Sequence, residues 1–205
     1  MLQKVNKMKA LLLSSSPVEK NVQKEFLSLL DKKPEDIKVV MIPTAGYPKI
    51  EQKYVDLDIS ILKKLGVKNI IQIDLKEENE ESLREKFSDV DVAWMGGGNT
   101  FWLMHWIRKS GFDKVLPELF KNGLVYVGTS AGSLVCGKDI SISGWRSGWD
   151  RNVSGLKDFS GMGLVDYAIS PHYVDRDQKA INSCTKETGI KIKPLRDGEF
   201  VVVNR

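Results

Sequence analysis

One serine stands in a pattern that indicates covalent chemistry. Residues 124–134 read Leu-Val-Tyr-Val-Gly-Thr-Ser-Ala-Gly-Ser-Leu, with Ser130 at the centre of a Gly-x-Ser-x-Gly motif. A run of strand length enters the motif, and small and apolar residues that can start a helix leave it. Small flanking residues let the chain turn sharply and lift the serine hydroxyl to the helix N-terminus. The pattern predicts a nucleophile elbow at Ser130, and the alternative is a tight glycine-rich connection with an idle serine.

A serine nucleophile needs a base, and the chain has only two histidines. His105 lies within an apolar stretch of helical spacing at 101–107, which favours a packed or surface-lying side chain. His172 follows a predicted strand, and functional groups in open α/β sheets collect beyond the carboxyl ends of strands. We therefore predict that His172 is the general base, the alternative being a structural loop histidine.

The base needs a carboxylate to hold its tautomer. Asp197 lies in Leu-Arg-Asp-Gly-Glu at 195–199, a turn between two late strands, and is the first choice. Glu199 is close enough in the sequence to compete. Asp175 and Asp177, near the base, are weaker candidates because a helix start favours acidic residues for capping alone.

A glycine-rich turn at 96–98 follows one predicted strand and precedes a helix, so its backbone amides can face developing negative charge. The amide of Ala131, directly after the nucleophile, is the second predicted oxyanion donor. A turn of this kind also suits a phosphate, but it lacks both Gly-x-Gly-x-x-Gly and the Lys-Ser/Thr of a P-loop. We therefore rank oxyanion binding above nucleotide binding.

Alternating elements are expected to position these groups. Buried strands are predicted at 9–14, 38–42, 69–73, 91–95 and 124–127, and helices at 18–30, 54–65, 80–87 and 100–109. Later elements are a strand near 167–170, a helix near 177–187, and strands near 191–195 and 199–203. The order predicts one α/β domain over residues 1–205, a mostly parallel sheet with helices on both faces.

Between the two halves, residues 141–163 are rich in Gly, Ser and Asp and predict a long irregular segment or a short hairpin. Trp145, Arg146 and Trp149 in this segment suggest a lid over the site, although packing of an exposed loop explains them equally well.

Composition excludes several classes of protein. Hydrophobic residues make up 41% and charged residues 28%, and no apolar run approaches the roughly 20 residues of a membrane span. The net charge of +4 is spread without a basic stripe, which argues against nucleic-acid binding. Cys136 and Cys184 lack metal-ligand spacing, which argues against a structural metal site. The apolar run at 10–13 is too short for a secretion signal. We expect a cytoplasmic protein, a monomer or small homo-oligomer, without metal or cofactor and without a membrane or nucleic-acid partner.

Four blocks taken together, Gly96-Gly97-Gly98-Asn99-Thr100-Phe101, Gly128-Thr129-Ser130-Ala131-Gly132, Ser170-Pro171-His172 and Leu195-Arg196-Asp197-Gly198, resemble the dipeptidase E family, the aspartyl dipeptidases related to cyanophycinase. The resemblance implies a fold related to class I glutamine amidotransferases and cleavage of dipeptides that begin with aspartate. It also implies Ser130 as nucleophile, His172 as base, Asp197 as acid, and Gly98 with Ala131 as oxyanion donors.

Some positions depart from that family. Arg196-Asp197 replaces Pro-Glu, which shortens the acid by one methylene, and Thr129 stands where the dipeptidase has tryptophan, which implies a larger pocket beside the nucleophile. The chain ends at Arg205, where dipeptidase E continues with further strands.

Arg176 lies in a segment that resembles an arginine-bearing segment of the dipeptidase, and its planar fork suits a substrate carboxylate. Asn99 and Thr129 are the other predicted substrate-binding residues. The prediction is a serine peptidase that cleaves small peptides, Asp-X dipeptides among them, through an acyl-enzyme. The alternatives are an esterase or amidase acting on a small metabolite and a catalytically weak binding protein of the same fold.

Overall fold

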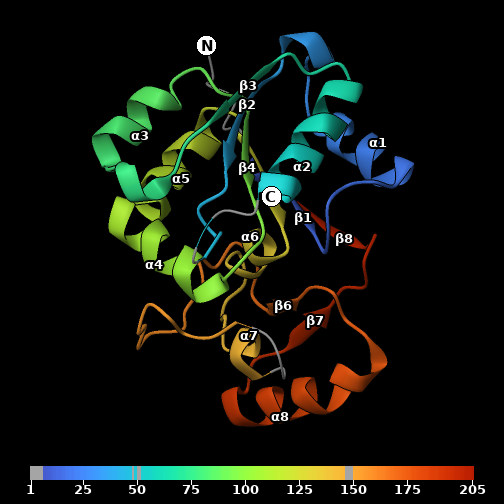
Figure 1. Cartoon of the computed structure of the whole chain (residues 1–205), viewed down its shortest axis with the longest axis vertical. Helices are drawn as coiled ribbons and strands as arrows, with labels where there is room; N and C mark the ends of the chain where they lie inside the picture. Colours follow the sequence, from blue (N-terminus) through green and yellow to red (C-terminus); the bar gives the residue numbers. More distant parts are fainter. Residues whose placement is uncertain (1–6, 48, 50–51, 146–149) are drawn as a thin grey trace.

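The computed structural model describes residues 7–47, 49, 52–145 and 150–205. Its main sheet has six strands in the order β3-β2-β4-β5-β1-β8 (Figure 1). The strands are β1 (Lys9–Leu13), β2 (Lys38–Ile42), β3 (Asn69–Gln72), β4 (Val92–Met95), β5 (Val125–Thr129) and β8 (Phe200–Asn204). The first five pair in parallel, and β8 pairs antiparallel with β1 at the edge of the sheet.

Helices cover both faces of this sheet, as predicted (Figure 1). One face carries α1 (Lys20–Ser28) and α2 (Gln52–Lys64). The other carries α3 (Glu80–Lys86), α4 (Thr100–Ser110), α5 (Phe112–Lys121) and the short α6 (Ala131–Leu134). Short 3-10 turns, η1 (Pro34–Asp36) and η2 (Leu75–Glu77), complete this half.

Alternation along the strands explains the two apolar layers. In β1, Leu11 and Leu13 join the core under α1 and α2, whereas Ala10 and Leu12 join the core on the opposite face. Successive strand side chains point to opposite faces, so a strand that is apolar throughout is buried on both sides.

Among the described residues, none of the helices combines the length and apolar character needed to cross a bilayer.

The second half of the chain adds a smaller layer, drawn in orange and red in the lower part of Figure 1. It contains β6 (Ala168–Ser170) and β7 (Ile192–Pro194), which form a separate two-stranded parallel sheet, together with η3 (Asp175–Asp177) and α8 (Gln178–Thr188). Within the described residues of the segment predicted to be irregular, 141–163, a short helix forms, α7 (Ile142–Trp145), and Ser160 forms an isolated bridge with Asp139, which precedes the segment.

Helix α5 was absent from the sequence prediction. Pro117 lies inside it and removes one backbone donor, which argues against a helix when only local preferences are considered. The helix nevertheless forms because Val115, Leu116, Leu119 and Phe120 are buried on one side of it. Tertiary burial has overridden the local signal.

The topology gathers several chain segments at one edge of the main sheet. Strands β1, β4 and β5 are parallel, so the residues that follow them lie at the same edge. Strand β8 runs the opposite way, so the turn that precedes it reaches that edge too, and Ser14 N donates to Glu199 O at 3.1 Å. Ser130 follows β5, the glycine-rich turn follows β4 and Asp197 precedes β8, whereas His172 follows β6 of the smaller sheet.

Candidate active site

Ser130 lies at a sharp turn between β5 and α6. Its φ of 52° and ψ of −112° are unusual for a residue with a side chain, a conformation that costs of order 1–3 kcal/mol. Backbone hydrogen bonds on both sides hold it: Ser130 N donates to Leu13 O at 3.1 Å, and the amides of Ser133 and Leu134 donate to Ser130 O. The nucleophile elbow predicted from the sequence therefore has the expected strand, turn and helix.

The glycines of the motif are sterically required. A Cβ at Gly128 would lie 2.4 Å from the carbonyl oxygen of Gly132, and a Cβ at Gly132 would lie 2.1 Å from that of Met95. The buried Tyr126 hydroxyl donates to the same Gly132 oxygen at 2.7 Å. These close approaches lock the elbow against β4, so its shape depends on backbone packing.

The predicted base contacts the serine, and the predicted acid contacts the base. The Nε2 atom of His172 is 3.0 Å from the Ser130 Oγ, and its Nδ1 atom is 2.5 Å from the Oδ1 of Asp197. With the proton on Nδ1 donated to the carboxylate, the Nε2 lone pair faces the serine hydroxyl, which is the tautomer that a general base requires. The side chains of His172 and Asp197 are 36% and 65% exposed, so this half of the site is open to water.

The competing carboxylates bond elsewhere. The Oε2 atom of Glu199 accepts the backbone N–H of Arg196 at 2.7 Å. Asp175 is paired with the Arg196 guanidinium at 2.5 Å, and Asp177 accepts the backbone N–H of Val174 at 2.9 Å. The structure thus places Asp197, the first choice from the sequence, beside the imidazole.

The glycine-rich turn after β4 passes directly against Ser130. A Cβ at Gly97 would lie 3.1 Å from the Ser130 Cβ, and Gly98 has a φ of 142° with Ala45 O only 2.3 Å from where its Cβ would be. Ala131 is the first residue of α6, so its amide has no helical acceptor. Within the described part of the chain, no acceptor is paired with the amides of Gly98 and Ala131.

The three predicted substrate-binding residues differ in accessibility. Arg176 is exposed on η3 and forms no ion pair with any described residue. Asn99 is half-buried and caps α4: its Oδ1 accepts from Trp102 N, and its Nδ2 donates to Arg151 O. Thr129 is 4% exposed, and its hydroxyl donates to Met95 O at 3.4 Å. Arg176 is therefore the most available of the three to a ligand.

Other candidate residues lie away from this cluster. His105 on α4 stacks on Trp102 and meets Trp106 edge to face, and burial, reinforced by the charge of Lys109, lowers the pKa of His105. Cys136 and Cys184 are buried and free, and burial raises the pKa of Cys184 to about 11.

The structure describes one of the three residues that the sequence suggested as a lid. Trp145 packs against the core, whereas Arg146 and Trp149 lie outside the described residues. Among those described, no group of His, Cys, Asp and Glu is arranged to hold a metal ion.

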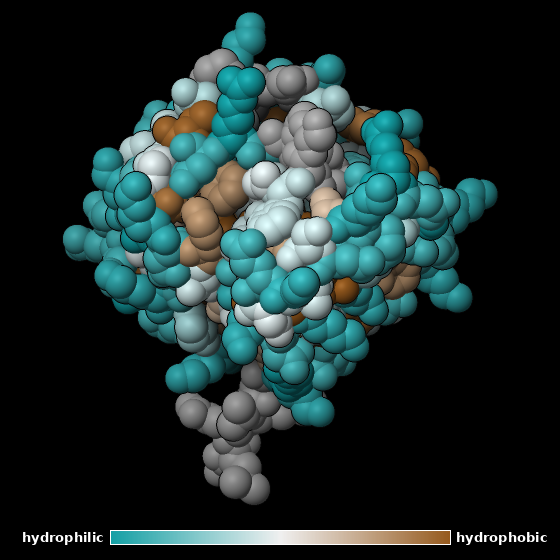
Figure 2. Space-filling model, turned by 90° about the horizontal axis from the view of Figure 1, so that it is seen from below, coloured by the Kyte–Doolittle hydropathy of each residue, from teal (hydrophilic) through white to brown (hydrophobic). Residues whose placement is uncertain are grey.

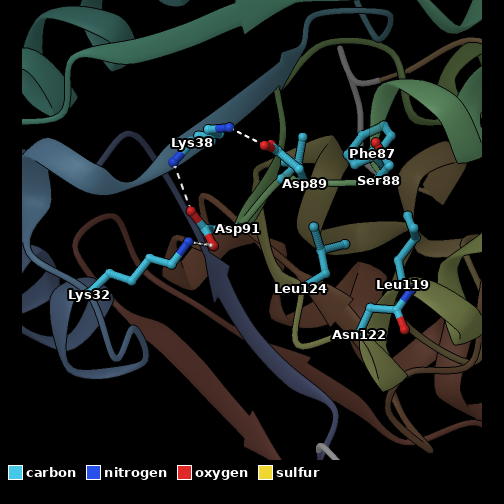
Figure 3. A pocket seen from close by; sticks show the side chains of 10 residues that line it. Lys32, Lys38, Phe87, Ser88, Asp89, Asp91, Leu119, Asn122 and Leu124 are labelled. Atoms are coloured by element: carbon cyan, nitrogen blue, oxygen red, sulfur yellow. Dashed lines mark hydrogen bonds and ion pairs between the residues drawn. The ribbon is translucent and has the colours of Figure 1, made fainter.

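A pocket of about 200 Å³ lies at the opposite, amino-terminal end of the strands (Figure 3). Two lysines and two aspartates line it, and they neutralise one another. Lys32 pairs with Asp91 at 2.8 Å, and Lys38 pairs with Asp89. The charges of the two lysines and two aspartates in this pocket are therefore compensated by one another.

The sequence analysis missed one residue that contacts this cluster. Ser14, the first residue after β1, has no exposed surface, and its Oγ accepts the backbone N–H of His172 at 2.7 Å. The same hydroxyl lies 3.0 Å from Leu195 O and 3.2 Å from the Asp197 Oδ1. The predicted first strand, at 9–14, ends at Ser14, but nothing local in the sequence indicates its contacts with His172 and Asp197.

A strained serine at a strand-to-helix turn, beside a histidine and a carboxylate on a mostly parallel α/β sheet, is the arrangement of a serine hydrolase. Residues 10–205 match peptidase family S51, and the chain belongs to this family of serine peptidases. The membership confirms the resemblance inferred from the four sequence blocks.

Individual relatives agree with the family. An uncharacterized peptidase of Listeria innocua is 30% identical over 171 residues, which cover 80% of this chain and 79% of that protein. Peptidase E of Haemophilus influenzae is 26% identical over 166 residues, covering 81% of this chain and 68% of that one. The crystal structure of a putative peptidase E protein from Listeria monocytogenes superimposes with a TM-score of 0.80, at 24% identity, over 97% of this chain and 95% of that one. The superposition confirms the predicted α/β fold.

Proposed function

We propose that this peptidase hydrolyses small peptides through an acyl-enzyme on Ser130, with His172 as general base and Asp197 as the acid that orients it. The observation that carries the proposal is the continuous chain of contacts, 3.0 Å from Ser130 Oγ to His172 Nε2 and 2.5 Å from His172 Nδ1 to Asp197 Oδ1. Each distance suits direct proton transfer or charge-assisted hydrogen bonding.

In the acylation step, the Ser130 Oγ attacks the carbonyl carbon of the scissile peptide bond while Nε2 of His172 takes the hydroxyl proton. Asp197 stabilises the imidazolium that forms. The carbonyl oxygen becomes an oxyanion, which the amides of Gly98 and Ala131 would stabilise. Collapse of the tetrahedral intermediate breaks the C–N bond, and His172 gives its proton to the leaving amine.

In the deacylation step, water takes the place of the amine. His172 removes a proton from that water, the hydroxide attacks the ester carbon, and the bond to Ser130 Oγ breaks with return of the proton to the serine. The open surroundings of His172 and Asp197 suit this step, because the incoming water must reach Nε2.

For the substrate we propose short peptides that begin with an acidic residue. Arg176, four residues after the base, has a guanidinium free to form two hydrogen bonds with a carboxylate. Several relatives of similar sequence are named peptidase E. The end of the molecule that carries α8 is mainly hydrophilic, with apolar side chains in small separate groups, which suits a polar substrate better than a lipid ester (Figure 2).

The experiment is a substrate screen with purified protein. Asp-, Glu- and neutral-leading dipeptide amides are compared with small esters, and stopped-flow traces are examined for a burst of product that marks an acyl-enzyme. The proposal expects turnover of Asp-leading dipeptides. Ester hydrolysis without any peptide hydrolysis would replace the peptidase proposal by the esterase alternative, and no turnover of either class would support a binding protein.

A further inference from the structure

We propose that Ser14 is a positioning residue for catalysis, holding His172 and Asp197 in the geometry that the reaction needs. The inference rests on the proposed function, because positioning has meaning only if His172 acts as the base. Ser14 does not touch the reacting atoms, so it would act through the two residues that it contacts.

The Ser14 side chain joins three segments that are distant in the sequence. It follows β1, its oxygen accepts the His172 amide at 2.7 Å, and its proton can go to Leu195 O at 3.0 Å or to the Asp197 Oδ1 at 3.2 Å. The Oδ1 atom that Ser14 approaches is the same oxygen that contacts the imidazole. One hydroxyl therefore contacts the backbone of the base and the side chain of the acid.

The base and the acid need such an anchor. His172 has a φ of 52°, a left-handed conformation that is costly for a histidine and persists only when its surroundings hold it. The side chain of Asp197 is 65% exposed and that of His172 is 36% exposed, so burial alone does not fix their positions. Ser14, by contrast, is fully buried, and its own amide is bonded to Glu199 O at 3.1 Å.

Burial and hydrogen bonding fix the orientation of the Ser14 hydroxyl. A buried serine whose oxygen accepts one bond and whose proton donates another cannot rotate without leaving a partner unsatisfied. The His172 amide and the Asp197 oxygen are thus tied to the end of β1, the strand next to β5. Because Ser130 N is bonded to Leu13 O, the residue before Ser14, the nucleophile and its partners share one support.

The test compares Ser14→Ala with a matched control, Ser110→Ala. Ser110 is also a buried serine, 1% exposed, but it lies at the last residue of α4 and its hydroxyl bonds to Ile107 O. We expect Ser14→Ala to lower kcat by roughly 10- to 100-fold with little change in KM, the size of effect expected when one hydrogen bond to a charged or strained group is lost. Ser110→Ala should leave kcat within about twofold of the wild type.

Two further measurements separate positioning from a purely structural role. The same Ser14→Ala change is made in a His172→Ala background, where it should cause no further loss of kcat because no imidazole remains to be positioned. Ser14→Thr, which keeps the hydroxyl, should recover part of the rate. Melting temperatures of all variants show whether the proteins remain folded.

The reaction of Ser130 with a fluorophosphonate distinguishes failure of this inference from failure of the proposed function. A wild type that does not react at Ser130 would overturn both. A reactive wild type with a Ser14→Ala variant of equal reaction rate and equal kcat would overturn the inference alone. Equal losses of kcat from Ser14→Ala with and without His172 would also overturn it, since the effect would then be structural.

Discussion

Ser130 and the two residues proposed to act with it belong to regions of the molecule that are built in different ways. Ser130 is fixed by the backbone: it lies between a buried strand and a buried helix, with glycines pressed against neighbouring carbonyl oxygens. His172 and Asp197 lie in loops outside the main sheet. Hydrogen bonds of their side chains and of the Ser14 hydroxyl hold them, together with backbone bonds that join Tyr173 and Ser170 to Leu195. The difference indicates that the elbow is preformed by the fold, whereas the base and acid depend on a few specific contacts.

The largest expected effect comes from removing the imidazole of His172, the proposed base. His172→Ala should lower kcat by roughly 10³–10⁶-fold, as much as Ser130→Ala, and the double variant should be no slower, because a nucleophile and its base act as a unit. The control is His105→Ala, which removes ring contacts on α4 and should reduce the melting temperature more than the rate. Similar rate losses for the two histidine variants would contradict the assignment of the base.

The next effect concerns the substrate. Arg176→Ala should reduce kcat/KM for an Asp-leading dipeptide by roughly 10- to 1,000-fold, the range expected for losing a charged hydrogen-bonded pair, and should hardly change hydrolysis of a neutral ester. Arg176→Lys should recover only part of the loss, because an ammonium cannot reproduce the planar fork. Steady-state kinetics on both substrates decide the matter: an equal loss on dipeptide and ester would exclude a role in specificity.

A third prediction tests the rigidity of the nucleophile half. Gly132→Ala places a Cβ 2.1 Å from Met95 O and should destabilise the protein by at least roughly 1–3 kcal/mol, measured by urea denaturation. Gly144→Ala is the control, since its Cβ would meet only Phe101 at 3.4 Å, and we expect a change within about 0.5 kcal/mol. A stable Gly132→Ala variant with wild-type activity would show that the elbow is not locked by packing.

These contrasts explain which parts of the molecule the sequence could predict. The elbow is local, so the strand, the motif and the helix stand in one stretch of eleven residues, 124–134, and the pattern was sufficient. The two-sided burial of β1, β2, β4 and β5 was equally visible as apolar runs, whereas β3, predicted to be buried, lies at the edge of the sheet and is mostly exposed. The roles proposed for His172 and Asp197 rest on different grounds: His172 is one of only two histidines, and Asp197 was chosen from its turn between two predicted strands and from the family resemblance.

Other features depend on contacts between distant residues and left no pattern to detect. The hydroxyl of Ser14 meets His172 across 158 positions, so nothing local marks it. Helix α5 was missed because Pro117 lowers its local preference, whereas its stability comes from burial. The pairing of β6 with β7 as a separate small sheet likewise depends on tertiary packing.

The smallest predicted effect is on the stability of the protein. It concerns a residue on the face of the sheet that α1 and α2 cover, away from the proposed site. Asp58 on α2 is 4% exposed and accepts a bond from Trp94 Nε1 at 3.0 Å; burial raises its pKa, although hydrogen bonds from Ser16 and Trp94 oppose the shift. The folded protein therefore keeps this proton to a higher pH than the unfolded chain does. The corresponding stability is full below the unfolded pKa of about 3.9 and is lost as the pH rises through the folded value.

Replacing the carboxylate by an amide should remove this loss. We expect Asp58→Asn to raise the melting temperature by a few degrees at pH 7.5, at about 2–4 °C for each kcal/mol, and by less at pH 4. Asp56→Asn, an exposed aspartate on the same helix, is the control and should show no such pH dependence. A stabilisation that is larger at pH 4 than at pH 7.5 would have the wrong sign for a buried carboxylate.

The central claim is that the fold activates Ser130 through His172. The most direct measurement is intact-mass analysis of the protein after reaction with a fluorophosphonate, followed by peptide mapping of the adduct. We predict one adduct per chain on Ser130 in the wild type, none in Ser130→Ala, and a rate at least 100-fold slower in His172→Ala. An adduct on another residue, or equally fast labelling without His172, would contradict the account.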